Sequence, residues 1–152
     1  MTRDWKKEAM EAIEARWAED EARWRRENVG KARFYLVNAS DDAPTFSADG
    51  QVVLRSVMAA LKENKIEADA PFMTLDSADA VGGYTGEIAV IVQAFGPVLT
   101  GILGAWLQSK AGRKVRFKDG DIEVEARTVD EVGKLLEMAE ERRVKRQLEG
   151  DS

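Results

Sequence analysis

An uncharged run of 20 residues, 88–107, constrains the fold of this chain more than any other feature. The chain as a whole is 34% charged, so such a run has to be covered either by protein or by lipid. As one continuous helix it would measure about 30 Å, which matches the hydrocarbon thickness of a bilayer. We therefore predict a helix over 88–107 and weigh two environments for it.

The predicted helix has two unlike faces. At 100° per residue its large apolar side chains gather on one side, whereas Gly96, Thr100 and Gly104 recur every four residues on the other. Small residues at this spacing let two helix backbones approach closely. We expect the bulky side to lie on a sheet and the small side, with Gln93, to receive a second helix. Pro97 either kinks this helix or restarts it at a first turn.

A single membrane-spanning helix is the alternative for the same run. Its ten Val, Ile, Leu or Phe residues favour insertion by about 3 to 6 kcal/mol. Gln93, Pro97 and three glycines oppose insertion. In this alternative the basic residues from Lys110 onward would lie on the cytoplasmic side. We favour burial within protein and keep the membrane span as the second hypothesis.

Composition limits the remaining possibilities. A length of 152 residues predicts one domain, with room for an appendage. The net charge of −5 makes nucleic acid an unexpected partner, and we interpret the short basic run of Arg113, Lys114, Arg116 and Lys118 as a solvated face. Without cysteine there is no disulfide framework, and the first residues lack an apolar signal core, so we expect a cytoplasmic protein.

The first 29 residues predict an interaction arm. Residues 4–27 contain no Gly or Pro and many helix-forming residues, so we expect one charged helix. Its large apolar side chains share one arc, as in an amphipathic helix that needs a surface to cover it. That surface belongs either to the chain's own domain or to another protein. The residues on the arc are Trp5, Ala9, Met10, Ile13, Trp17 and Trp24.

Residues 31–148 are predicted to form one α+β domain of order β-α-β-α-β-β-α. The alternation on either side of Asp119-Gly120 predicts a tight hairpin, and Thr128 with Glu131 forms a capping box at the start of the last helix. We see no internal repeat. The predicted elements are a strand at 33–37, a helix at 51–64, an extended piece at 66–75, the helix at 88–107, a hairpin of 114–118 and 122–126, and a helix from 128 to about 148.

The side chains used most often in catalysis and metal binding are missing. The chain has no histidine and no cysteine, and its serines lie in no nucleophile motif, so we expect no enzyme, no metal and no cofactor. The spacing of Asp41, Asp42 and Asp49 is not that of a calcium loop, and we interpret them as a solvated acidic loop. The glycine loop 82–86 precedes the predicted helix, where backbone amides can hold an anion, and it supports an alternative as a small-ligand sensor.

Three stretches carry a resemblance to a known family. They are the helix Val52-Val-Leu-Arg-Ser-Val, the apolar helix ending Ala105-Trp106-Leu107, and the hairpin and helix that begin Arg113-Lys-Val-Arg-Phe and continue Ile122-Glu-Val-Glu-Ala. In this order they resemble the effector-associated constant component of bacterial conflict systems, over residues 45–142. The resemblance implies a small non-catalytic module that accompanies effectors in bacterial immunity operons. The N-terminal helix lies outside it.

The sequence therefore predicts a non-enzymatic adaptor that self-associates or docks on a larger effector. The contacts would be made by the apolar stripe of the N-terminal helix and by the small face of the apolar run. The alternatives are a membrane component that spans at 88–107 and a small-ligand sensor that uses the loop 82–86. The candidate contact residues are Trp5, Ile13, Trp17, Trp24, Gln93, Gly96, Thr100 and Gly104.

Overall fold

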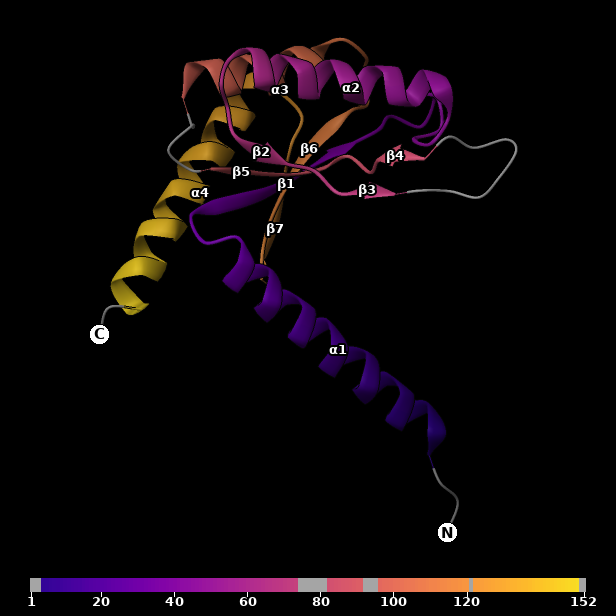
Figure 1. Ribbon diagram of the computed structural model, residues 1–152, viewed down its shortest axis with the longest axis vertical. Helices are drawn as coiled ribbons and strands as arrows, with labels where there is room; N and C mark the ends of the chain where they lie inside the picture. Colours follow the sequence, from indigo (N-terminus) through magenta and orange to yellow (C-terminus); the bar gives the residue numbers. More distant parts are fainter. Residues whose placement is uncertain (1–3, 74–81, 92–95, 121, 151–152) are drawn as a thin grey trace.

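The computed structural model describes residues 4–73, 82–91, 96–120 and 122–150. A five-stranded sheet is covered on one face by three helices, and a fourth helix runs away from the other face (Figure 1). The helices are α1 (Trp5–Glu27), α2 (Ala48–Glu63), α3 (Pro97–Gln108) and α4 (Val129–Gly150). The strands of the sheet are β1 (Lys31–Val37), β2 (Ala68–Asp69), β5 (Glu87–Ile91), β6 (Lys114–Asp119) and β7 (Ile122–Ala126). Two short strands, β3 (Phe72–Met73) and β4 (Gly83–Tyr84), pair separately.

The sheet has the order β2-β5-β1-β6-β7, and every neighbouring pair is antiparallel. The connections β1-α2-β2 and β5-α3-β6 therefore each join two parallel strands with one strand between them. Two such interleaved split β-α-β units are the topology of a ferredoxin-like fold, to which β7 and α4 are added here. The predicted α+β class is confirmed. Because this fold serves many unrelated functions, function has to be argued from the surfaces.

The core lies between the sheet and α2, α3 and α4. The rings of Phe34 in the central strand β1 and Phe117 in β6 pack at a centroid distance of 5.6 Å with an interplanar angle of 41°, and both are buried. Leu99 and Leu103 of α3 and Val132 of α4 cover them and are at most 1% exposed. The bulky side of α3 thus lies on a sheet, as its pattern predicts.

The predicted single helix over 88–107 is wrong. Residues up to Ile91 form β5, and α3 begins at Pro97, which occupies the first turn and restarts the chain as a helix. Because β5 is an inner strand of the sheet, Ile88, Ala89 and Val90 are all buried and show no alternation. Among the residues that the structure describes, no helix is long and apolar enough to cross a membrane. A single-pass span at 88–107 is therefore contradicted.

The local signals near the C-terminal half are confirmed. β6 and β7 form the predicted hairpin, with Gly120 at a φ of 64° in its turn. The hydroxyl of Thr128 accepts a hydrogen bond from the amide of Glu131, whose carboxylate reaches back to the amide of Arg127. These contacts satisfy amides that the first turn of α4 would otherwise leave unpaired.

The small face of α3 receives a second helix, but that helix is α4 of the same chain. A Cβ added at Gly104 would lie 2.9 Å from Cγ2 of Val129, so the two helices approach too closely for a larger residue. Gly104 is buried in this contact. It therefore does not belong to a free surface of the chain.

Candidate functional site

The N-terminal helix α1 is the least covered element of the described structure. It has 23 residues, and none of them is buried. Figure 1 shows it running from the domain toward the N-terminus without a neighbour along most of its length. Helices of this length gain most of their stability from packing, so α1 presents an unpartnered surface. We call its four exposed large apolar residues the arm stripe: Trp5 (67% exposed), Met10 (52%), Ile13 (41%) and Trp17 (65%).

The base of α1 is held by a clamp on Arg33 of β1. Both carboxylate oxygens of Glu21 accept hydrogen bonds from Nη2 of Arg33 at 2.6 Å, and the guanidinium lies 4.2 Å from the ring centroid of Trp24. Arg33 is only 8% exposed. Burial disfavours its charge, but Glu21, Tyr35 and Glu87 outweigh that effect and raise the pKa of Arg33. Arg33 therefore remains a cation held between a carboxylate and an aromatic face.

A second anchor lies at the hairpin turn. Asp119, which is 9% exposed, accepts a hydrogen bond from Nε of Arg142 at 2.6 Å and also pairs with Arg146. Arg25 of α1 lies 3.8 Å from the same carboxylate. The last two turns of α1 are thus fixed to the sheet and close to α4, whereas its first four turns extend beyond these contacts.

The face of the sheet on the side of α1 is charged. We call it the open sheet face; it consists of the outward residues of β1, β5, β6 and β7. Arg33 stands opposite Lys118, and Arg116 stands opposite Glu125, with which it forms an ion pair at 3.1 Å. Burial and Glu87 raise the pKa of Tyr35 on this face. The remaining charged residues of this face are Lys31, Glu87, Lys114 and Glu123.

A groove of about 840 Å³ lies between α1 and the open sheet face. One wall carries Trp17 and Trp24, and the other carries Arg33, Glu87 and Lys118. Among the described residues, Lys118 forms no ion pair, although its neighbours on the sheet do. In this groove, Trp17 and Trp24 therefore lie across from Lys118, a cation that has no carboxylate partner among the described residues.

The residues of α1 that form the clamp belong to a four-residue unit that occurs twice in the sequence, seven residues apart, so the prediction of no internal repeat is wrong. Glu14-Ala-Arg-Trp17 is repeated as Glu21-Ala-Arg-Trp24. Seven residues bring the second unit back to within about 20° of the first on a helix, so both units point to the same side. The second unit holds Arg33. In the described part of the chain, neither Glu14 nor Trp17 has an ion pair, a hydrogen bond or a ring contact.

The structure separates the predicted contact residues into three groups. Trp5, Ile13 and Trp17 are exposed on α1, whereas Trp24 is half-buried against Arg33. Gly96 and Thr100 are half-buried near α4, and Gly104 is covered by it. Gln93 lies outside the described residues. Among the described candidates, the residues of the arm are therefore the most exposed, and Gly104 of the small face is covered by α4.

The glycine loop 82–86 does not lie at a helix start. Gly83 belongs to β4, and Gly86 leads directly into the inner strand β5, where its carbonyl accepts a hydrogen bond from Leu36 at 2.8 Å. An added Cβ at Gly86 would lie 2.9 Å from the carbonyl of Leu36. Close strand approach explains Gly86, and the side chain of Gln51 fills the space beside Gly83. The anion site expected from a following helix is not formed.

Asp42 and Arg113 are not solvated, contrary to the prediction from their charged segments. Nη2 of Arg113 donates to Asp42 at 2.9 Å, and the two side chains are 6% and 9% exposed respectively. Nη1 of Arg113 also donates to the carbonyl of Trp106 and to the hydroxyl of Ser109. The ion pair therefore fastens the C-terminal end of α3 to the loop after β1.

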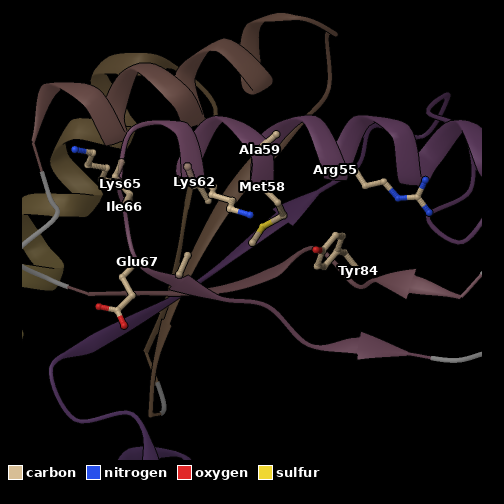
Figure 2. Close-up of a pocket in the computed structure, with 10 residues that line it drawn as sticks. Arg55, Met58, Ala59, Lys62, Lys65, Ile66, Glu67 and Tyr84 are labelled. Carbon is tan, nitrogen blue, oxygen red and sulfur yellow. The ribbon is translucent and has the colours of Figure 1, made fainter.

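A second groove, of about 600 Å³, lies between α2 and the edge strand β2 (Figure 2). Met58, Ile66 and Tyr84 give it an apolar lining, while Lys62 and Glu67 supply charges of both signs. Arg55 and Lys65 stand at its rim. It contains no convergent set of polar groups comparable to the clamp on Arg33, so the arm and the open sheet face remain the better candidate.

Comparisons of the chain with protein-family models, with curated proteins and with solved structures find no match.

Proposed function

We propose that this chain is a non-catalytic docking module that binds a protein partner through the arm stripe of α1. The observation that carries the proposal is that a 23-residue helix with two exposed tryptophans has no buried residue. Tryptophan, with tyrosine and arginine, is enriched among the residues that contribute most to the binding energy of protein interfaces. Since its base is fixed by Arg33 and Asp119, the arm can present that stripe at a defined angle.

Two further observations support a docking role over catalysis. The chain has neither histidine nor cysteine, and its buried charges, such as Arg113 and Asp42, are used in ion pairs that join structural elements. The resemblance to the effector-associated constant component family gives the setting: the module would accompany an effector protein in a bacterial defence system. The partner would then be that effector, a second copy of the chain, or both, in the cytoplasm.

Replacing Trp17 by alanine should weaken association with the partner by roughly 30-fold, as expected when a central tryptophan of an interface is truncated. The measurement is the molar mass by light scattering, for the chain alone and mixed with the products of neighbouring genes. Trp17 is 65% exposed, so the variant should keep its fold and its unfolding midpoint.

Glu19→Ala is the matched control, because Glu19 is also exposed on α1 but lies on the side away from the stripe. It should leave association within a factor of about two, as expected of a residue outside an interface. Equal association of both variants with every partner that the native chain binds would refute the docking role of the stripe.

A further inference from the structure

We infer that the arm of one chain docks on the open sheet face of a second copy, where Glu14 and Trp17 hold Lys118. This inference rests on the proposed docking role of α1 and names its partner. It starts from the sequence unit Glu-Ala-Arg-Trp, which occurs at 14–17 and at 21–24. The unit at 21–24 binds Arg33, whereas the unit at 14–17 binds no cation within the described residues.

The occupied unit shows which surface such a unit binds. Glu21 and Trp24 take a cation from the open sheet face, with both carboxylate oxygens at 2.6 Å from Arg33 and the ring at 4.2 Å. Glu14 and Trp17 have the same chemistry at the same spacing, about 10 Å further along the helix. A surface that binds one unit is the best available match for the other.

The open sheet face offers a second cation at the right place. Lys118 stands directly opposite Arg33 in the pairing of β1 with β6, and it lines the groove beneath α1. It forms no ion pair within the described residues, whereas Arg33 pairs with Glu21 of its own arm at 2.6 Å and with Glu87 of β5 at 3.7 Å. Trp17 of the same chain lines the groove that contains Lys118, but neither Glu14 nor Trp17 forms an ion pair, hydrogen bond or ring contact within the described residues. Since α1 then extends away from the domain toward the N-terminus (Figure 1), Lys118 is left for the same unit of a second copy.

The charges around the stripe agree with this occupant. Residues 5–20 of α1 carry five acidic and three basic side chains, while the open sheet face carries five basic and three acidic ones, so the two surfaces have opposite net charge. Opposite charges facing each other across an interface fix its register and exclude partners with the wrong sign. A nucleic acid or an anionic membrane would meet the acidic flanks of the same stripe, so both fit this surface less well.

Reciprocal docking of the two arms would give a closed dimer. If each arm lies on the sheet of the other copy, the same residues are used twice and the result is a twofold dimer without open ends. Two tryptophans from each arm would bury on the order of 600 to 1,000 Å². With the sheet surface that they cover, the total reaches the roughly 1,200 to 2,000 Å² of a specific interface.

Disulfide trapping between two differently tagged chains tests the exchange, because the native chain has no cysteine. One chain carries Ile13→Cys on the stripe, and the other carries Glu123→Cys, which stands opposite Lys118 on β7. After mixing and mild oxidation we expect a disulfide between the two chains. The matched control replaces Ile13→Cys by Ala15→Cys, which lies on the far side of α1 and should give about a tenth of the product or less.

Adding Trp17→Ala to the Ile13→Cys chain should remove the cross-link, and the native chain should have the mass of a dimer by light scattering. Equal trapping at positions 13 and 15, or trapping that survives Trp17→Ala, overturns the exchange. A native chain that stays monomeric overturns it as well. In that case, binding of a neighbouring gene product that still depends on Trp17 would leave the docking function standing, and loss of both would refute both.

Discussion

Replacing Asp42 by alanine should lower the free energy of unfolding by about 3 to 5 kcal/mol, because the change leaves a buried guanidinium without its carboxylate. The side chain of Arg113 is 6% exposed and would keep its hydrogen bonds to the carbonyl of Trp106 and the hydroxyl of Ser109 and its contact with the Trp106 ring, but no carboxylate. The amide of Ala39, which donates to Asp42 at 2.7 Å, would also lose its acceptor. Urea denaturation followed by circular dichroism measures the loss.

The same ion pair should make stability depend on pH in a defined direction. The hydrogen bond from Arg113, aided by the amide of Ala39, holds the pKa of Asp42 below its ordinary value, although burial acts in the opposite sense. A carboxyl whose pKa is lower in the folded state contributes stability above its unfolded pKa of about 4, and this contribution is lost as the pH falls through the folded pKa. The difference between native chain and Asp42→Ala should therefore be constant above about pH 5 and shrink below about pH 4.

Asp41→Ala is the control for both measurements. Asp41 is the neighbouring carboxylate, its side chain is 76% exposed, and its ion pair with Lys110 spans 3.9 Å. Exposed pairs contribute about 0 to 1 kcal/mol, so this variant should be nearly neutral. If Asp42→Ala were equally mild, the buried ion pair would not stabilise the fold in the way described.

Replacing Gln51 by alanine should lower the free energy of unfolding by about 2 to 4 kcal/mol, because this one buried side chain makes three hydrogen bonds to backbone groups. The amide nitrogen of Gln51 donates to the carbonyls of Thr45 and Tyr84 at 2.7 and 2.9 Å, and its oxygen accepts from the amide of Tyr84 at 2.8 Å. Gln51 is 0% exposed. The same denaturation series measures the loss, and hydrogen exchange at the amide of Tyr84 should become faster.

Two comparisons make the Gln51 result specific. Val52→Ala, at an exposed neighbour in the same helix turn, should change stability by less than about 0.5 kcal/mol. Gln51→Glu retains the shape of the side chain but cannot donate when ionised, so at neutral pH it should be destabilised like the alanine variant. A Gln51→Glu protein as stable as the native chain would show that these donor contacts contribute little.

Features that depend on near neighbours were predictable from the sequence. The hairpin around Gly120 and the capping box of Thr128 and Glu131 are specified by turn and cap chemistry within a few residues. The charged helix at the N-terminus follows in the same way from composition alone. These are the predictions that the structure confirms with the least change.

Features that depend on contacts between residues far apart in the sequence could not be predicted from the sequence. The inner strand β5 has the same uninterrupted apolar character as a buried helix, so only its pairing with β1 and β2 distinguishes the two. Gln51 and Asp42 look like solvated residues until Tyr84 and Arg113 are placed beside them. The small face of α3 was correctly read as a helix contact, but its partner α4 could not be identified before the fold was known.

The candidate site was predictable from the sequence only in part. Trp5, Ile13 and Trp17 were identified from the pattern of α1, and the structure leaves them exposed. Arg33 was missed, because a cation in a strand of mixed character carries no signal of its own. The repeat of Glu-Ala-Arg-Trp was visible in the sequence, but its meaning as a cation clamp needs the contact of Glu21 and Trp24 with Arg33.

The central claim is that residues 5–17 of α1 have no packing partner within the described part of a single chain and gain one on association. Amide hydrogen exchange along residues 5–17, measured over a range of protein concentrations, tests it most directly. We expect these amides to exchange nearly freely in dilute solution and to become protected as the concentration rises or as a bound partner is added. Strong protection in dilute solution that does not change with concentration would contradict the claim, because the arm would then already be stable without a partner.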